Sequence, residues 1–479
     1  MSSLNVLEPA AAPPRRSRSQ RYYIETWGCQ MNELDSQRMA GQLMSQGLLP
    51  TRDPRDADVI LLNSCSVREK AQNKVYSRLG EYRRFKDHNP DLLVGLCGCV
   101  AQQEGERALR RVSDLDFVLG PARVGELRSV LDRRRGGERV VATGFPEQRN
   151  YEFDAIDRDG LYKGMVTIIE GCNKRCTFCI VPSTRGPERC RPFEEILEEV
   201  RHLLSFGFVE IELLGQTVNH WQDPQQDLDF ADLLDAVARL EGLKRLRFVT
   251  SYPRDFTPAM VEQFARHPNI CPYLHLPVQS GSDRVLKRMG RGYEVAPYRE
   301  LLASIREARP EIALSTDLIV GFPGETEEDF RQTLELVEEV RYASIFAFKY
   351  SPRPGTAAPR LKDPVDDADA SRRLQELFDL QNSIQLEIHQ QMVGERHEIL
   401  VTSGVREDGT QMGRTPCHRI VHFPVAEAPV SPGSLTEVEI VHGGPHSLRG
   451  TLTAPPPAAS PEGAEAGLRG SSGLPVLRG

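Results

Sequence analysis

Short apolar segments alternate with amphipathic helical segments along most of this 479-residue chain, and this alternation limits the possible folds more than any other feature. Strand and helix in alternation predict a parallel, doubly wound α/β sheet for the amino-terminal part. There we expect strands at 22–26, 59–62, 92–96 and 117–119, a helix at 33–46, and a second helix with Val67, Ala71, Val75 and Leu79 on one face.

A longer series of the same kind follows from about residue 158. Six strand–helix units predict an open barrel related to the eight-fold barrel, with its active residues at the carboxyl ends of the strands. The expected strands are 165–169, 209–214, 246–250, 273–276, 312–320 and 344–349, with helices such as 193–205 and 327–340 between them.

The remaining segments have a different composition. Short apolar stretches at 398–402, 420–423 and 435–441, broken by Gly, Pro and Ser, predict a small β-barrel. No apolar run approaches the ~20 residues of a membrane span. The expected division is a disordered arm at 1–20, a first domain at 21–135, a linker at 136–157, a second domain at 158–390, the small barrel at 391–453 and a disordered tail at 454–479.

Cys172, Cys176 and Cys179 follow the first strand of the second series. Three thiolates this close can bind one metal centre, but a closed site needs four ligands, so one coordination position stays open. An open position on iron binds and activates a small molecule, which predicts a chemical rather than a structural site. The alternative is half of a zinc site, although no second doublet of Cys or His lies nearby.

A second set of cysteines, Cys29, Cys65 and Cys99, lies farther apart in the sequence. Each follows an expected strand within a few residues. Because the carboxyl ends of parallel strands share one edge, the three sulfurs should meet there and form a second three-cysteine cluster site. The alternative is three unrelated buried thiols.

The spacing of cysteine, three residues, cysteine, two residues and cysteine resembles that of the radical S-adenosylmethionine (SAM) enzymes. That resemblance implies a [4Fe–4S] cluster on Cys172, Cys176 and Cys179, SAM bound at its free iron, and Phe178 beside the SAM adenine. Further SAM contacts are expected from Gly215, Gln216, Ser251, Asp317, Gly321 and Glu325, although Gly321-Phe322-Pro323-Gly324 is equally typical of a tight turn.

The two cysteine sets together resemble the methylthiotransferases, over about residues 21–452. The resemblance implies an auxiliary [4Fe–4S] cluster on Cys29, Cys65 and Cys99, and a carboxy-terminal RNA-binding barrel of the TRAM type. Gln30-Met31-Asn32 points to the branch that modifies N6-isopentenyladenosine at position 37 of tRNA, while threonylcarbamoyl-adenosine or a ribosomal-protein aspartate remain alternatives. The matching segments are 26–32, 62–71, 98–102, 274–282 and 321–326.

The family resemblance also implies partners: the tRNA, a reductase and a protein that supplies sulfur or iron–sulfur units. The formal net charge of −8 requires that any RNA contact come from a local patch. Ten cysteines without an export signal predict a reducing cytoplasm. Candidates for RNA contact are Arg185, Arg189 and Arg191, which could instead form an ordinary solvated surface. We expect His275 and Gln279 either to line the substrate pocket or to be hydrogen-bonded core residues.

Four cysteines remain outside the two sets. We expect Cys97, Cys190, Cys271 and Cys417 to be ordinary free thiols. Cys97 precedes Cys99 by two residues, so either sulfur could serve as the ligand, and the motif favours Cys99.

Overall fold

The computed structural model describes residues 19–66, 69–147, 162–426 and 428–453. The tail expected at 454–479, residues 1–18 of the arm, residues 148–157 of the linker and Val67 lie outside this part of the chain, and the Ala71 side chain is not described.

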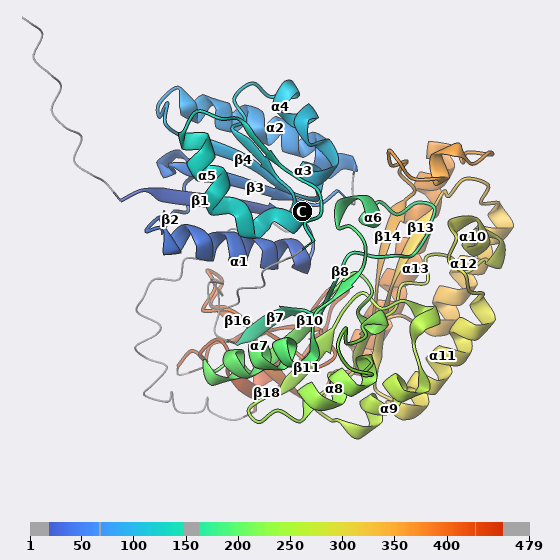
Figure 1. Cartoon of the computed structure of the whole chain (residues 1–479). Coiled ribbons are helices and arrows are strands. Elements are labelled where there is room, and N and C mark those ends of the chain that lie inside the picture. Colours follow the sequence, from blue (N-terminus) through green and yellow to red (C-terminus); the bar gives the residue numbers. More distant parts are fainter. Residues whose placement is uncertain (1–18, 67–68, 148–161, 427, 454–479) are drawn as a thin grey trace, which may run out of the picture.

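A six-stranded parallel sheet, in the order β2-β1-β3-β4-β5-β6, forms the centre of the first domain (Figure 1). This confirms the predicted sheet. The order makes β1, β3 and β4 neighbours, which brings the turns that follow them together. The strands are β1 (Arg21–Trp27), β2 (Leu49–Pro50), β3 (Val59–Ser64), β4 (Leu93–Gly98), β5 (Phe117–Leu119) and β6 (Val140–Ala142).

Helices cover both faces of this sheet, as a doubly wound fold requires. Met39 of α1 and Val130 of α5 belong to the apolar cluster on one face, and Val75 and Leu79 of α2 to the cluster on the other. Strand β6 lies within the segment expected to be a linker, because the glycines and the proline on either side of it are typical of a linker. The helices are α1 (Gln30–Ser45), α2 (Glu69–Lys86), α3 (Cys99–Glu104), α4 (Glu106–Arg111) and α5 (Leu127–Arg135).

The second domain has two parallel sheets of three strands, β11-β10-β7 and β12-β13-β14. A parallel bridge between Leu246 and Ile270 joins them, which gives the expected open barrel. All six expected strands are present, with ends shifted by a few residues: β7 (Lys163–Thr167), β10 (Glu210–Leu214), β11 (Arg245–Phe248), β12 (Tyr273–His275), β13 (Ala313–Val320) and β14 (Ser344–Lys349).

Helices on the outer side of these strands bury one apolar face each (Figure 1). In α7 the sequence places Ile196, Val200 and Leu203 at helical spacing, and all three are buried. A short hairpin of β8 (Ile169–Glu170) and β9 (Arg189–Cys190) brackets the cysteine loop. The helices are α6 (Val181–Thr184), α7 (Phe193–Ser205), α8 (Phe230–Ala238), α9 (Pro258–Arg266), α10 (Asp283–Met289), α11 (Val295–Ala308) and α12 (Glu327–Val340).

Helix α13 (Asp367–Gln391) leads into a closed five-stranded barrel in the order β15-β16-β17-β19-β18, which confirms the expected small barrel. The barrel is attached near the amino ends of the second domain's strands. There Arg245 donates to the Arg414 carbonyl at 2.8 Å, and Arg247 to that of Thr415 at 3.2 Å. The strands are β15 (Arg396–Val401), β16 (Thr410–Arg414), β17 (Ile420–Pro424), β18 (Leu435–Gly443) and β19 (Leu448–Leu452).

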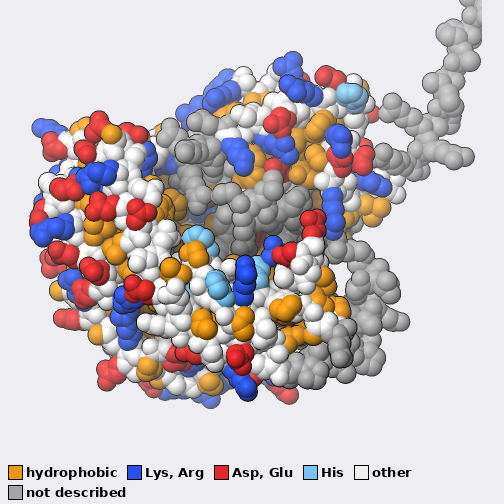
Figure 2. Space-filling view, turned by 180° about the vertical axis from the view of Figure 1, so that it is seen from behind, with side chains coloured by type: hydrophobic (Ala, Val, Ile, Leu, Met, Phe, Trp, Pro, Cys, Tyr) orange, Lys and Arg blue, Asp and Glu red, His pale blue; other side chains and the backbone are white. Residues whose placement is uncertain are grey.

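Acidic and basic side chains are interspersed on the surface seen from behind, and histidine side chains gather near its middle (Figure 2). This view shows no broad basic face, in keeping with the negative net charge. No helix within the described ranges combines the length and the apolar character needed to cross a membrane.

Candidate functional site

The first cysteine set lies where three adjacent strands end. Cys29 caps the amino end of α1 after β1, Cys65 follows β3, and Cys99 begins α3 after β4. The Cys65 amide donates to the Trp27 carbonyl at 2.8 Å, which ties the first two turns together. The sheet order therefore brings these three cysteines to one edge, as the sequence predicts.

Contacts among these thiols change their acidity. A hydrogen bond with Cys65 is the main cause that lowers the pKa of Cys29 to about 7 and that of Cys99 to about 6, and the positive charge of Arg185 lowers both further. The same hydrogen bonds raise the pKa of Cys65. Two of the three sulfurs are thus inclined to be thiolates near neutral pH, and the thiolate is the form that binds metal.

A polar network holds the turns of this set. Asn63 donates to the Asn32 carbonyl and to Ser36 Oγ, both at 2.8 Å, and Asn32 donates in return to Asn63 Oδ1 at 3.1 Å. Gly98 packs beside them with φ +86°, and a Cβ there would come within 3.0 Å of Asn63 Oδ1 and the Ser64 carbonyl. The sequence motifs contain both asparagines, but their spacing gave no sign of this pairing.

The second cysteine set occupies the loop between β8 and α6. The Cys172 amide donates to the Gly186 carbonyl at 3.1 Å, and the Thr177 amide to the Met289 carbonyl at 2.9 Å. Gly171, with φ +75°, packs against the backbone of residues 186 and 187 so closely that a Cβ would clash. Backbone contacts at residues 171, 172 and 177 therefore fix the conformation of the loop.

Burial makes two thiols of this set less acidic. It raises the pKa of Cys179 to about 12 and that of Cys172 above its ordinary value. Arg291 donates from Nη1 to the Cys176 sulfur at 3.5 Å, and its Nη2 is fixed on the Pro277 carbonyl at 2.7 Å. A metal would have to displace the thiol protons here, with Arg291 offsetting part of the resulting negative charge.

The donor chemistry of both sets suits iron–sulfur clusters better than a single ion. Within the described residues, no three Cys, His, Asp or Glu side chains are arranged to hold one metal ion. The sulfurs of a cubane cluster each bind a different iron, so they need not converge on one point. Three thiols without a fourth protein ligand match a [4Fe–4S] cluster with one free iron.

The two cysteine sets lie on facing surfaces of the first and second domains. Arg185 follows Cys179 by six residues, and α6 contacts α3, which begins at Cys99. The Arg185 guanidinium reaches Asp35 of α1 at 2.8 Å and hydrogen-bonds to the Cys99 sulfur. One side chain from the second loop thus touches the first set.

Several of the expected SAM contacts lie around the second loop. Ser251 Oγ is buried without a hydrogen-bond partner among the described residues, as expected for a hydroxyl that binds a ligand. Phe178 stands edge-on to Phe322 at 6.3 Å. Gln216 accepts from the Gly171 amide at 2.5 Å, so it supports the loop, and Gly215 packs against Ile169 with no room for a Cβ.

The other expected contacts have structural partners. Glu325 accepts from the Gly321 amide at 2.6 Å and pairs with Arg373 at 2.8 Å, which is the tight turn that the sequence offered as an alternative role. Asp317 lies 3.4 Å from His275 Nε2 and is one-third exposed, so it remains accessible to a ligand.

Backbone strain marks two strand ends that sequence patterns do not reveal. Thr250 has φ +67° and Gln279 has φ +79°, values that non-glycine residues adopt rarely and at an energetic cost. Thr250 precedes Ser251, and the Gln279 amide donates to the Asp317 carbonyl at 2.9 Å. The strained residues therefore adjoin two of the SAM candidates.

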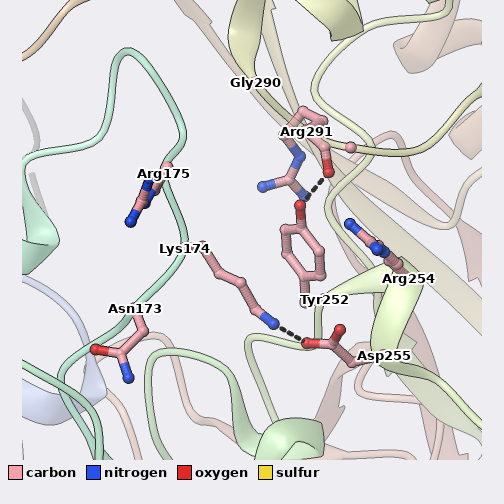
Figure 3. A pocket seen from close by; sticks show the side chains of 9 residues that line it. Asn173, Lys174, Arg175, Tyr252, Arg254, Asp255, Gly290 and Arg291 are labelled. Atoms are coloured by element: carbon pink, nitrogen blue, oxygen red, sulfur yellow. Dashed lines mark hydrogen bonds and ion pairs between the residues drawn. The ribbon is translucent and has the colours of Figure 1, made fainter.

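A hollow of about 450 Å³ adjoins the second cysteine loop (Figure 3). Lys174 pairs with Asp255 at 2.5 Å across it, and the Arg291 guanidinium stacks 4.5 Å from the Tyr252 ring centre. The exposed Arg175 adds further positive charge. The hollow suits an anionic partner next to Cys176. Its lining comprises Asn173, Lys174, Arg175, Tyr252, Arg254, Asp255, Gly290, Arg291 and Gly292.

The prediction that three arginines contact RNA is wrong for two of them, because these two are buried. Arg185 is only 5% exposed, and Arg191, 1% exposed, pairs with Glu199 at 2.6 Å. Both are buried because each neutralises a carboxylate that is itself buried. Arg189 is half-buried and donates to the Glu147 carbonyl at 2.7 Å.

The extra cysteines differ from the two sets in their surroundings. Cys97 points into the apolar cluster under α1 and α5, where burial raises its pKa. Its neighbours are hydrophobic, so its placement favours Cys99 as the ligand. Burial also raises the pKa of Cys271 to about 11, Cys190 is half-buried, and Cys417 contacts Arg419 at 2.7 Å.

Comparisons with known proteins agree with this geometry. Residues 166–337 match the model of the radical SAM superfamily, and residues 21–120 match that of the uncharacterized protein family UPF0004. The tRNA-2-methylthio-N6-dimethylallyladenosine synthase of Chromohalobacter salexigens is 45% identical over 444 residues, which is 91% of this chain and 99% of that protein. The chain belongs to this synthase family.

A second member, from Bordetella pertussis, is 46% identical over 437 residues, with 90% of this chain and 97% of the relative covered. Among solved structures, the radical SAM methyltransferase TsrM from Kitasatospora setae has a TM-score of 0.51 at 14% identity, covering 82% of this chain and 79% of TsrM. That likeness shows a shared fold. Membership of the radical SAM superfamily implies SAM and a [4Fe–4S] cluster as cofactors.

Proposed function

We propose that this synthase-family chain transfers a methylthio group to C2 of N6-(dimethylallyl)adenosine at position 37 of tRNA. The names of its relatives support this substrate. The observation that carries the proposal is the facing placement of two three-cysteine sets, joined through Arg185. A reaction that must both activate an aromatic C–H bond and deliver sulfur needs two such sites beside one substrate.

In this proposal Cys172, Cys176 and Cys179 hold the cluster that binds SAM, and Cys29, Cys65 and Cys99 hold an auxiliary [4Fe–4S] cluster. When bound, these groups supply the radical, the sulfur and the methyl group that side chains cannot provide.

The chain's own residues bind and orient these groups. Ser251 offers its free hydroxyl to SAM, and Phe178 an apolar ring edge for the adenine. Gln216 fixes the loop through the Gly171 amide. Arg291 donates to the Cys176 sulfur and so helps to orient it.

The partners follow from the same reaction. We infer that the carboxy-terminal barrel contacts the tRNA, and that the modified base enters flipped out of the loop, as single-stranded RNA bases usually do. The barrel is attached at the amino ends of the strands, away from the cysteines, so the RNA would extend along the second domain. A sulfur or iron–sulfur supply protein and a cytoplasmic location complete the proposal.

The cation-lined hollow is our candidate surface for the reductase. Its position supports this role, because Arg291 lies between the hollow and the Cys176 sulfur. Lys174, Arg175 and Arg254 would attract an acidic electron donor.

Nucleoside analysis of tRNA from a strain without this gene tests the function. We expect 2-methylthio-N6-(dimethylallyl)adenosine to disappear and its precursor to accumulate, and the intact gene to restore the product. A Cys172→Ala gene should not restore it. Unchanged product in the deletion strain, with loss of methylthiolated threonylcarbamoyl-adenosine or of the modified ribosomal-protein aspartate, would assign the chain to another substrate.

A further inference from the structure

Four charged side chains of alternating sign cross the boundary between the first and second domains. Arg185 lies 2.8 Å from Asp35, Asp35 lies 3.9 Å from Arg38, and Arg38 lies 3.8 Å from Glu170. Arg38 also donates to Thr167 Oγ1 at 3.4 Å. Asp35 and Arg38 belong to α1, whereas Glu170 and Arg185 belong to the second domain. We call Glu170, Arg38, Asp35 and Arg185 the boundary ion-pair chain.

The ends of the boundary ion-pair chain coincide with the ends of the second cysteine loop. Glu170 stands two residues before Cys172, and Arg185 six residues after Cys179. Both are fastened to α1, and α1 begins directly after its cap, Cys29. The loop of one cysteine set is thus tied at both ends to the helix that positions the other set.

Burial makes this arrangement sensitive to change. Asp35 and Arg185 are 1% and 5% exposed, and Arg38 is 14% exposed. Removing one partner of a buried pair leaves an uncompensated charge, so the neighbouring groups must move or admit water. Arg185 additionally holds the Cys99 sulfur. A shift of the Arg185 side chain would therefore change the positions of residues in both cysteine sets.

We propose that the boundary ion-pair chain sets the separation and orientation of the two cysteine sets, with Arg185 as its central positioning residue. The expected effect on methylthiolation rests on the proposed function, whereas the positioning of the two domains by these ion pairs does not. Each cluster site is complete without the other domain's cysteines. Loosening the boundary should therefore leave both sites able to bind iron but should impair the step that needs them together.

The test compares Arg185→Gln with Arg185→Lys and the unchanged protein. For Arg185→Gln we expect near-normal SAM cleavage, but on the order of tenfold to hundredfold more 5′-deoxyadenosine released per methylthiolated tRNA, counted per chain that holds both clusters, since small misplacements have effects of this size. Arg185→Lys keeps the positive charge but loses the planar guanidinium. Its ratio of 5′-deoxyadenosine to methylthiolated tRNA should therefore lie between that of Arg185→Gln and that of the unchanged protein.

A second readout needs neither substrate nor cofactor. Hydrogen–deuterium exchange on the apoprotein should become faster at the start of α1 and in α6 in Arg185→Gln, while α2 stays protected. Arg78→Gln is the matched control, because it breaks a 2.7 Å pair with the buried Glu25 inside the first domain. It should loosen α2 and leave the product ratio unchanged.

The outcomes separate the two proposals. If the unchanged enzyme makes no methylthiolated nucleoside, the proposed function fails, and the exchange experiment still tests the boundary. An Arg185→Gln protein with normal exchange and a normal product ratio overturns the positioning role. Should Arg185→Gln not fold, Arg38→Gln replaces it, because Arg38 belongs to the same chain of charges through Asp35 and Glu170 and is more exposed than Arg185. Arg38→Gln is then expected to shift exchange and ratio in the same direction by a smaller amount, and unchanged values overturn the proposal.

Discussion

Replacing Gly98 with alanine should damage the first cysteine site through the backbone alone. Gly98 has φ +86° and ψ −157°, a conformation that is nearly exclusive to glycine and costs other residues on the order of 1–3 kcal/mol. The new Cβ would also come within 3.0 Å of Asn63 Oδ1 and the Ser64 carbonyl. Overpacking of this kind costs about 1–3 kcal/mol. We expect Gly98→Ala to lower the free energy of unfolding of the first domain by roughly 3 kcal/mol.

Function should suffer more than stability, because Asn63 holds the turn that leads to Cys65 and pairs with Asn32 beside Cys29. The assay combines denaturant unfolding of the apoprotein with iron content in a background whose second cysteine set is replaced by alanine. Iron in Gly98→Ala should fall well below that of the parent.

Gly80 provides the matched control for this substitution. It lies on the exposed side of α2, and a Cβ there would meet nothing within 4 Å. Gly80→Ala should therefore raise stability by up to about 1 kcal/mol and leave iron content unchanged. If Gly98→Ala proves as stable as the parent and binds iron equally well, the reasoning about this turn is wrong.

Three other predictions concern separate parts of the chain. Burial lowers the pKa of His389 near the end of α13, whose ring hydrogen-bonds to the Gly444 carbonyl of the barrel, so the folded state resists protonation of this side chain. Stability should therefore fall as the pH drops below about 6.5. In pH-dependent melting, His389→Gln should not show this loss of stability. Cys97→Ser should keep the full iron content, and loss of a cluster would make Cys97 a ligand. Arg175→Glu with Arg254→Glu should weaken reduction by an acidic protein donor several-fold but leave SAM cleavage with dithionite unchanged; an equal loss with both reductants would remove the hollow as the docking surface.

The fold could be predicted largely from local patterns. Sequence periodicity located all six strands of the two parallel sheets in the second domain, and the helix expected at Phe193–Ser205 has those ends in the structure. Leu49–Pro50 and Arg189–Cys190 have two residues each, too few for periodicity to register, and they become strands only because a neighbouring strand offers its edge. Val140–Ala142 was missed because glycines and a proline flank it, and Thr410–Arg414 and Leu448–Leu452 were missed because neither is a continuous apolar stretch.

The cysteine sets were predictable because sulfur spacing and strand ends are local features. The partners of the arginines were not. Arg185 lies in a polar-looking segment and was expected on the surface, but it is buried against Asp35. Nothing in either segment alone signals that pairing, since it exists only after two domains meet. Ser251 was predictable from its place after a strand, whereas the strain at Thr250 was not.

The most direct test of the account is the iron content after anaerobic reconstitution, measured together with methylthiolated tRNA. We expect about eight irons per chain for the unchanged protein. About four should remain when either cysteine set is replaced by alanine, with product from neither variant. Four irons in the unchanged protein, or full product from a chain lacking Cys29, Cys65 and Cys99, would contradict the claim that two clusters act together at one domain boundary.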